Sequence, residues 1–172
     1  RGEFDRFLLR PLHPLLQIAC DGFDDDSWGE LIIAIAIVVW SVFHVNLSFI
    51  EIISIPVIVL ISFLVYCGIS ILLSTVSFYT VAQADIANLT YEISDFAKYP
   101  MTIFPGWLQL IFTFVFPIGF AAYYPVSSIL KVNNVLSTGL SLVLGILIST
   151  LFLILSVRVW NMGCKHYSGC GT

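Results

Sequence analysis

The sequence predicts an all-α protein, a polytopic membrane helix bundle with four transmembrane helices and one cytoplasmic amphipathic helix. Of its 172 residues, 59% are hydrophobic. Only 10% are charged, whereas soluble domains carry about 25%. The charged residues also lie far apart, so that long apolar stretches separate them. No soluble fold of this length could bury so much apolar surface, and a membrane protein is therefore expected.

Four uncharged stretches are each long enough for one membrane crossing. They cover residues 31–50, 52–84, 99–130 and 132–157. A helix needs roughly 20 apolar residues to cross about 30 Å of hydrocarbon. We therefore predict a single transmembrane domain over residues 1–172, with helices at 31–47, 53–80, 107–124 and 138–157.

Residues 1–30 form a polar segment ahead of the first helix. Ser27 and Glu30 have the spacing of a capping box, which favours a helix start at this point. The preceding acids 24–26 are consecutive and lack the alternating ligand spacing of a calcium loop. A helix start is therefore expected here, and no metal site is predicted.

Two helices carry regular series of small or polar residues. Residues every four positions lie on one helix face, where they could line a pathway or let two helices pack closely. Packing is the preferred interpretation, and a pathway remains the alternative. The series on the second helix is Ser62, Tyr66, Ser70 and Ser74, and that on the fourth is Ser141, Gly145 and Ser149.

The connection 82–105 is predicted to hold the cytoplasmic amphipathic helix. Apolar residues recur there at helical spacing, with acids and an amide on the opposite face. The segment is too polar to span and should lie at the cytoplasmic interface or project beyond it. Its acidic face favours a protein neighbour over lipid headgroups alone. In the next helix, Pro117 should produce a kink, because proline removes a backbone hydrogen bond.

Basic residues indicate the orientation. Cytoplasmic loops are enriched in Lys and Arg, and four crossings put both chain ends on one side. Six of the seven basic residues then share that side, and Lys131 alone lies on the other. Both ends and the 82–105 connection are therefore predicted to be cytoplasmic.

Motifs of common catalytic sites are missing from the sequence. It contains no G-x-x-x-x-G-K-[ST] phosphate loop, no H-E-x-x-H and no G-x-S-x-G. The interiors of the predicted helices also lack Asp, Glu, Lys and Arg, which weakens proton- or sodium-coupled transport. An intramembrane enzyme using His44 or Tyr66 would lack a matched nucleophile and base. We therefore expect neither an enzyme nor a cofactor bound by this chain, and an energy source would have to come from another protein.

The opening stretch EFDRFLLRPLHPLLQ, Glu3 to Gln17, combines apolar anchors with charges of both signs. Its Phe and Leu side chains could enter a groove on a partner protein while its charges fix the orientation. The P-x-x-P spacing could also bind an SH3-like domain, although this signal is weak alone. The alternative is a juxtamembrane elbow that has no partner.

Three stretches carry a family resemblance that covers nearly the whole chain: FDRFLLRPLHPLLQ, KYPMTIFPGWLQLIFTFVFPIGFAAYYP and GCKHYSGCGT. The chain resembles the permease subunits of bacterial type-2 ATP-binding-cassette exporters, the ABC-2 family transporter proteins. Such permeases have six helices, and this chain resembles the last four, with upstream helices missing. The resemblance implies that residues 1–30 form the segment coupled to the ATPase. The coupling residues would be Phe4, Asp5, Arg6, Leu9, Arg10, Pro11 and Pro14.

The function implied is that of an exporter permease in the bacterial cytoplasmic membrane, moving an unknown substrate. A separate ABC ATPase subunit would bind ATP and Mg and supply the energy. A second permease subunit, identical or different, and the lipid bilayer would be the other partners, and no nucleic acid is expected. The alternative is a non-transporting membrane scaffold or assembly subunit.

Overall fold

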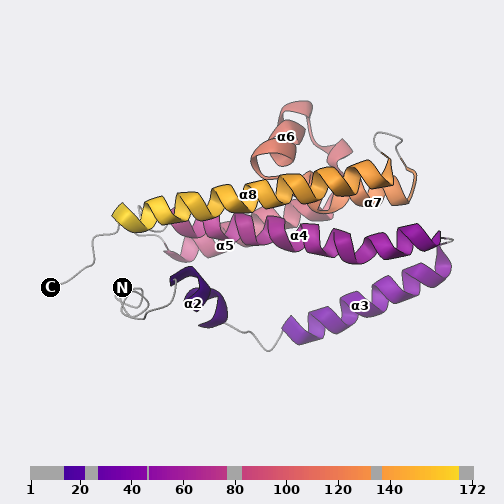
Figure 1. Ribbon diagram of the computed structural model, residues 1–172, viewed down its shortest axis with the longest axis horizontal. Coiled ribbons are helices and arrows are strands. Elements are labelled where there is room, and N and C mark those ends of the chain that lie inside the picture. Colours follow the sequence, from indigo (N-terminus) through magenta and orange to yellow (C-terminus); the bar gives the residue numbers. More distant parts are fainter. Residues whose placement is uncertain (1–13, 22–26, 46, 77–82, 133–136, 167–172) are drawn as a thin grey trace. The chain divides into compact units, whose positions relative to one another are not determined.

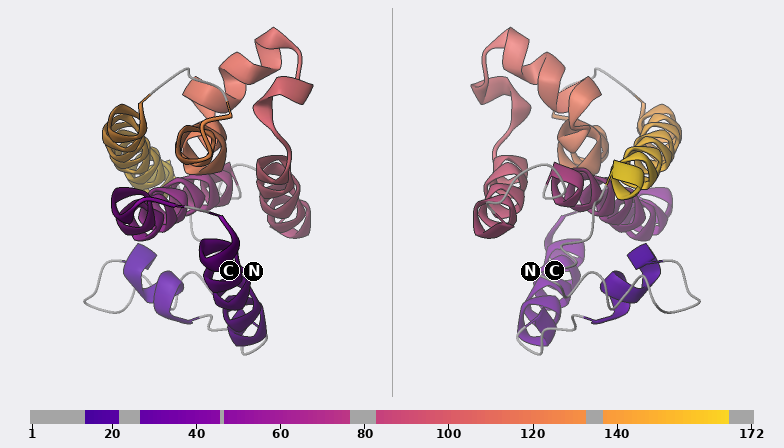
Figure 2. Two further views of the ribbon diagram at one scale, coloured as in Figure 1. Left: turned by 90° about the vertical axis from the view of Figure 1, so that its right-hand side faces the viewer. Right: turned by 90° about the vertical axis from the view of Figure 1, so that its left-hand side faces the viewer.

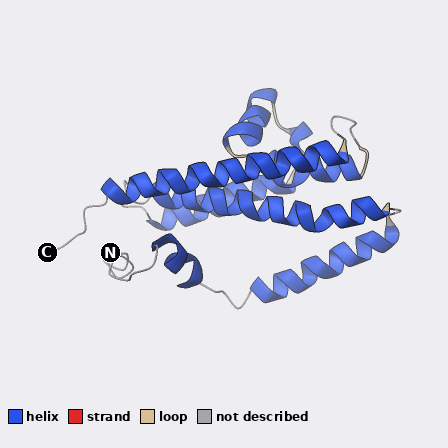
Figure 3. Ribbon diagram, in the orientation of Figure 1, coloured by secondary structure: helices blue, strands red, loops and turns tan. Residues whose placement is uncertain are grey.

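The computed structural model of the protein describes residues 14–21, 27–45, 47–76, 83–132 and 137–166. Its regular elements are helical, and the described residues contain no strand (Figure 3). The predicted all-α membrane bundle is therefore confirmed. The described elements fall into two units, the first with α2 and α3 and the second with α4 to α8.

The first unit contains two helices whose starts follow from the sequence. Helix α2 (Pro14–Asp21) begins on a proline, whose fixed φ suits the first helical turn. Helix α3 (Ser27–His44) begins at Ser27, the first residue of the capping box. The range predicted for its transmembrane part was 31–47. Helix α3 is long and apolar enough to cross a membrane, and none of its residues is buried. At its end, His44 Nδ1 donates to the carbonyl oxygen of Trp40, 2.8 Å away.

Two long helices form the frame of the second unit. Helix α4 (Phe49–Val76) and helix α8 (Thr138–His166) run side by side in the same direction (Figure 1). Each is long and apolar enough to span a membrane. Helix α4 begins before the predicted range 53–80, whose last residues, 77–80, lie outside the described part of the chain, and helix α8 extends beyond the predicted range 138–157. Charged and polar residues limit the lipid-embedded part of a helix, but they do not interrupt its backbone hydrogen bonds. Helix α8 therefore continues past Arg158.

A broken helix lies in the place of the third predicted crossing, 107–124. Its first limb joins α6 (Gly106–Leu110) to the π-helical η3 (Ile111–Val115), and its second joins the π-helical η4 (Gly119–Tyr123) to α7 (Tyr124–Ile129). The limbs are bent by 80°. The described chain thus has three candidate spans, or four if the bent pair is one span.

The connection between the second and third predicted crossings folds back along α4. Helix α5 (Gln83–Asp95) leads into the short 3-10 helices η1 (Phe96–Lys98) and η2 (Met101–Ile103). Helix α5 packs against α4 (Figure 2).

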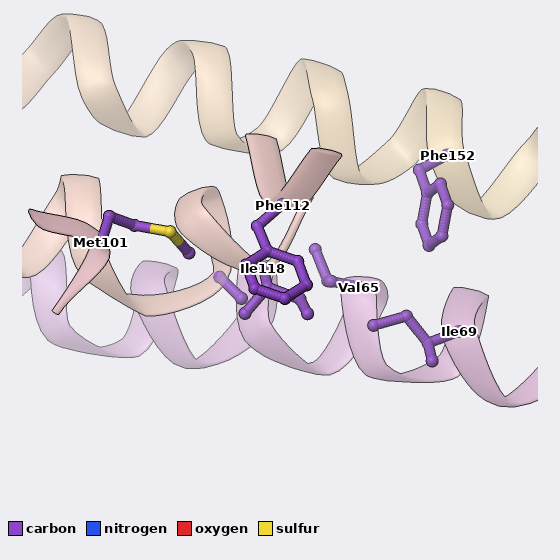
Figure 4. Close-up of a cluster of buried hydrophobic side chains, with 7 residues drawn as sticks. Val65, Ile69, Met101, Phe112, Ile118 and Phe152 are labelled. Atoms are coloured by element: carbon purple, nitrogen blue, oxygen red, sulfur yellow. The ribbon is translucent and has the colours of Figure 1, made fainter. Parts of the chain in front are cut away.

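Buried side chains from α4, η2, the bent pair and α8 form one core (Figure 4). Ile93 of α5 packs against this cluster, whereas Leu89, on the same predicted apolar face, is 44% exposed. The members of the cluster are Val65, Ile69, Met101, Phe112, Ile118, Ala121 and Phe152.

Candidate functional site

The proposed coupling residues lie almost entirely outside the described part of the chain. Phe4, Asp5, Arg6, Leu9, Arg10 and Pro11 belong to residues 1–13, which are not described. Pro14 is described and is the first residue of α2. The coupling role of this segment therefore stays a prediction.

The polar series predicted on α4 is packed against another element at Ser62 and is more exposed along the rest of the helix. The Ser62 hydroxyl donates to the carbonyl oxygen of Ile58 at 2.9 Å and also contacts the carbonyl oxygen of Ala121 in η4. Tyr66, one turn further, is 46% exposed. Ser70 is half-buried and Ser74 is exposed. Ser62 thus lies at a helix contact, whereas Tyr66 is accessible from outside the bundle.

The series on α8 lies in the contact with α4. Ser141 and Ser149 are completely buried. Gly145 faces Ile61 of α4 so closely that an added Cβ atom would stand 2.8 Å from the Ile61 Cδ1 atom. The Ser149 hydroxyl donates to the carbonyl oxygen of Ile146 at 3.1 Å. Its hydrogen-bond partner therefore lies on the same helix, and the hydroxyl needs none from α4. This geometry favours the packing interpretation of the series.

Sequence reasoning missed the reciprocal small residue on α4. An added Cβ atom at Gly68 would stand 2.6 Å from two atoms of the Phe152 ring, and 3.3 Å from the Ser156 hydroxyl oxygen. Ser156 is also completely buried. Its spacing of seven from Ser149 continues the small-residue face of α8 and could have extended the predicted series. The pairing of Gly68 with Phe152 depends on how the two helices meet and has no local signal.

At the end of the bundle where α4 begins, polar side chains link the segment before α4 to the segment after α7. Glu51 of α4 accepts a hydrogen bond from the Ser48 backbone amide at 2.7 Å, as in a capping box. Its other oxygen lies 3.4 Å from Lys131 Nζ, beyond the end of α7. Nearby, the Ser128 and Ser141 hydroxyls lie 2.9 Å apart. Polar contacts therefore join the start of α4, the end of α7 and the start of α8.

The bend in the third predicted crossing coincides with Pro117, as predicted. Phe116 has an extended backbone, with φ −116° and ψ 96°, and Pro117 follows it. A hydrogen bond spans the bend, since the Thr113 hydroxyl lies 3.0 Å from the Tyr124 hydroxyl. The Tyr124 ring also covers Gly119, where an added Cβ atom would stand 2.7 Å from it. The two limbs are thus connected by a side-chain contact as well as by the chain.

The described residues hold no group of three or more His, Cys, Asp or Glu side chains that could bind a metal ion. The second unit is a packed apolar bundle with polar contacts at the end where α4 begins and along the contact between α4 and α8. Such an arrangement is suited to membrane transport or assembly.

Comparison with known families identifies the kind of bundle. The sequence model of the ABC-2 family transporter proteins matches residues 1–171. The chain belongs to the ABC-2 transporter family. No curated protein and no solved structure matches it.

Membership places this protein among the membrane permease components of ABC transporters, which work with an ABC ATPase component. The part of the permease that the structure describes has three to four candidate spans, and the chain is a multi-pass membrane protein. The correspondence of its helices to the last four of six stays a prediction.

Proposed function

We propose that this permease is a subunit of a bacterial exporter that moves a substrate across the cytoplasmic membrane. The family match over residues 1–171 carries the proposal. A separate ATPase subunit would bind ATP and Mg and hydrolyse the ATP, because the sequence has no phosphate-binding loop of its own. The permease would pair with a second permease subunit, and both ends of the chain would be cytoplasmic.

The contact between α4 and α8 would act as one rigid part of the transporter. Gly145 and Gly68 allow close approach, and the serines beside them are buried with their hydroxyls bonded to backbone carbonyls. Small residues stabilise such contacts in membranes because lipid gives helices no hydrophobic reason to associate. Conformational change would then occur between this helix pair and other elements. The exposed Tyr66 and Ser74 would be the members of the α4 series available to a substrate or to the second permease.

The opening segment would transmit the motion of the ATPase. Its Phe and Leu side chains would enter a groove on that subunit, and Arg6 and Arg10 would fix the orientation through acidic partners. Charge reversal at both arginines should therefore weaken binding, because a close pair of like charges at an interface costs free energy.

The test is co-purification of the permease with the ATPase encoded beside it, followed by assay of ATP hydrolysis stimulated by transport. Arg6→Glu combined with Arg10→Glu should reduce both association and stimulated hydrolysis at least tenfold, about 1.4 kcal/mol. Lys165→Glu is the matched control, since Lys165 is an exposed basic residue at the far end of α8. The coupling assignment is wrong if the double variant behaves like the control. If the unaltered permease retains no ATPase, the scaffold alternative is favoured.

A further inference from the structure

The helical limb η4–α7 packs against both long helices of the second unit, α4 and α8 (Figure 1). Polar contacts join it to them at separate points along its length. Near its start, the Ser62 hydroxyl of α4 contacts a carbonyl oxygen of η4. Further along, the hydroxyls of Ser128 in α7 and Ser141 in α8 lie 2.9 Å apart. Beyond its end, Lys131 Nζ lies 3.4 Å from a carboxylate oxygen of Glu51 in α4.

Each of these hydroxyls also has an acceptor within its own element. The Ser62 hydroxyl lies 2.9 Å from the carbonyl oxygen four residues before it. The Ser128 and Ser141 hydroxyls lie 2.7 Å and 2.9 Å from the carbonyl oxygens three residues before them. A hydroxyl has one hydrogen to donate. If the limb separates from the helix pair, each hydrogen can therefore be donated within its own element, and no buried donor is left unsatisfied.

The ion pair beyond the end of the limb can open at a similarly low cost. The side chain of Lys131 is 76% exposed, whereas that of Glu51 is 10% exposed. An ion pair with an exposed partner contributes little stability. Glu51 also accepts a hydrogen bond from the Ser48 amide at 2.7 Å, which does not involve the limb. A further contact, from the Thr138 hydroxyl to the Ser128 carbonyl oxygen, is long at 3.4 Å.

A break in the helix precedes the limb. Phe116 has an extended backbone, and Pro117 has no N–H with which to continue the helical hydrogen bonds. Such short segments can absorb the rotation between two rigid elements. Across the break, the Thr113 hydroxyl lies 3.0 Å from the Tyr124 hydroxyl, and its second acceptor is the Gln109 carbonyl oxygen at 2.6 Å. The limb therefore has a hinge at one end and releasable contacts along its length.

Apolar packing does not fix the limb as firmly in a membrane as it would in water. Phe120 and Ile129 of the limb are buried, but lipid would offer them similar apolar surroundings. Interhelical hydrogen bonds in membranes are also individually weak, because the separated groups find other partners. The closed arrangement and an open one are therefore close in free energy, and a single ion pair can shift the balance between them.

We propose that the limb η4–α7 is a hinged element that swings away from α4 and α8 about Phe116 and Pro117, and that the ion pair of Glu51 and Lys131 is the latch that holds it closed. In a transporter it would be the element that moves against the helix pair. Hinge, limb and latch all belong to this chain, and their movement can be measured without substrate or ATPase. The proposal therefore does not depend on the exporter function proposed above.

The test is a distance measurement between two spin labels on the full chain in nanodiscs, with its four cysteines replaced. One label is at Val126 of the limb and the other at Ile53 of α4, both exposed. A control pair at Ile53 and Leu140, which is exposed on α8, joins the two helices that stay together. Glu51→Gln should add a longer distance between Val126 and Ile53. The ratio of open to closed limb should rise about threefold, as expected for an ion pair with one exposed partner.

The choice of variants separates release of the latch from general loosening. Glutamine at position 51 can still accept the Ser48 amide, as in a capping box, so the start of α4 is kept. Lys131→Glu places two carboxylates together and should raise the ratio at least about tenfold. Lys165→Glu makes the same charge change on an exposed residue at the far end of α8 and should leave both distances unchanged.

Two results would overturn the proposal. One is an unchanged distance between Val126 and Ile53 in Lys131→Glu, which would show that the ion pair does not hold the limb. The other is an equal broadening of the control distance between Ile53 and Leu140, which would show that the whole bundle loosens and that the limb does not move as a separate element.

Discussion

Gly68 lies where α4 meets α8, and its missing side chain leaves room for the Phe152 ring. Phe152 is buried, and two atoms of its ring stand 2.6 Å from the position of an added Cβ atom. Real Cβ atoms do not approach carbon atoms so closely, so a methyl group here must displace the ring or separate the helices. The close approach of α4 and α8 at this point thus requires that residue 68 has no Cβ atom.

We predict that Gly68→Ala destabilises the bundle. The added methyl group should cost about 1–3 kcal/mol in overpacking, which exceeds the gain of about 1 kcal/mol from replacing glycine in a helix interior. Unfolding in mixed detergent micelles, followed by circular dichroism, measures the difference.

A matched control and a rescue make this prediction specific. An added Cβ at Gly139, near the start of α8, has no atom within 4 Å, so Gly139→Ala should leave stability unchanged or raise it slightly. Phe152→Leu should restore part of the stability lost in Gly68→Ala, because contacting sites are not additive. Equal effects of Gly68→Ala and Gly139→Ala would show that this contact is not tight.

The small residues of this contact were only partly predictable from the sequence. The spacing of Ser141, Gly145 and Ser149 indicated a close approach, and all three are buried. The partner surface was not predictable, because the side chain that fills a groove depends on the position of the second helix. The same limit applies to Glu51, whose contact with Lys131 joins residues far apart in the chain.

At the scale of elements, the broken third crossing shows how local chemistry and packing combine. Proline has no N–H to donate, so a break at Pro117 follows from the sequence. The size of the bend does not. The 80° angle also involves π-helical turns on both sides and the contact between Thr113 and Tyr124.

We predict that Pro117→Ala straightens this element. Spin labels at Leu110 and Val126, both exposed, would report the distance between the limbs. The two positions are sixteen residues apart, so a straight helix would separate their Cα atoms by about 24 Å at 1.5 Å per residue. The distance in the bent form is shorter, and the variant should move toward the longer value. An unchanged distance would mean that Thr113 and Tyr124 hold the bend without help from proline.

The connection α5 illustrates a different limit of sequence reasoning. Its helical period and its two faces were evident from the residues. The helix packs against α4, and Ile93 of its apolar face packs against the core, although the sequence could equally place this face on a partner protein. An amphipathic period identifies the face that is buried but not the surface that buries it.

For the whole molecule, transport would depend on the direction in which each helix crosses the membrane. Helices α4 and α8 run in the same direction, and the limb η4–α7 between them leads back to the end where α4 begins (Figure 1). Composition predicted the class of the protein because charge depletion is a property of the entire chain. The orientation rests on a different signal, the basic residues, since the arrangement of helices is the same for either direction of insertion.

We predict that Lys131 and its neighbours face the exterior, whereas the end of α8 faces the cytoplasm. In a variant whose four cysteines are replaced, Val132→Cys should react with a membrane-impermeant maleimide in intact cells. Val132 is 66% exposed, so access should not limit the reaction. Asn161→Cys, exposed near the end of α8, should react only after the cells are permeabilised, because cytoplasmic loops retain Lys and Arg such as Arg158 and Lys165.

Most of α8 lies between these two positions in the sequence, so their labelling tests the crossing by α8 and its orientation together. Reaction of both in intact cells would mean that α8 does not cross the membrane. Reaction of Asn161→Cys alone would mean that the helices cross in the opposite direction. In that case the opening segment, on the same side as the end of α8 if there are four crossings, would be exterior and could not reach an ATPase. The coupling proposal therefore requires the predicted labelling pattern.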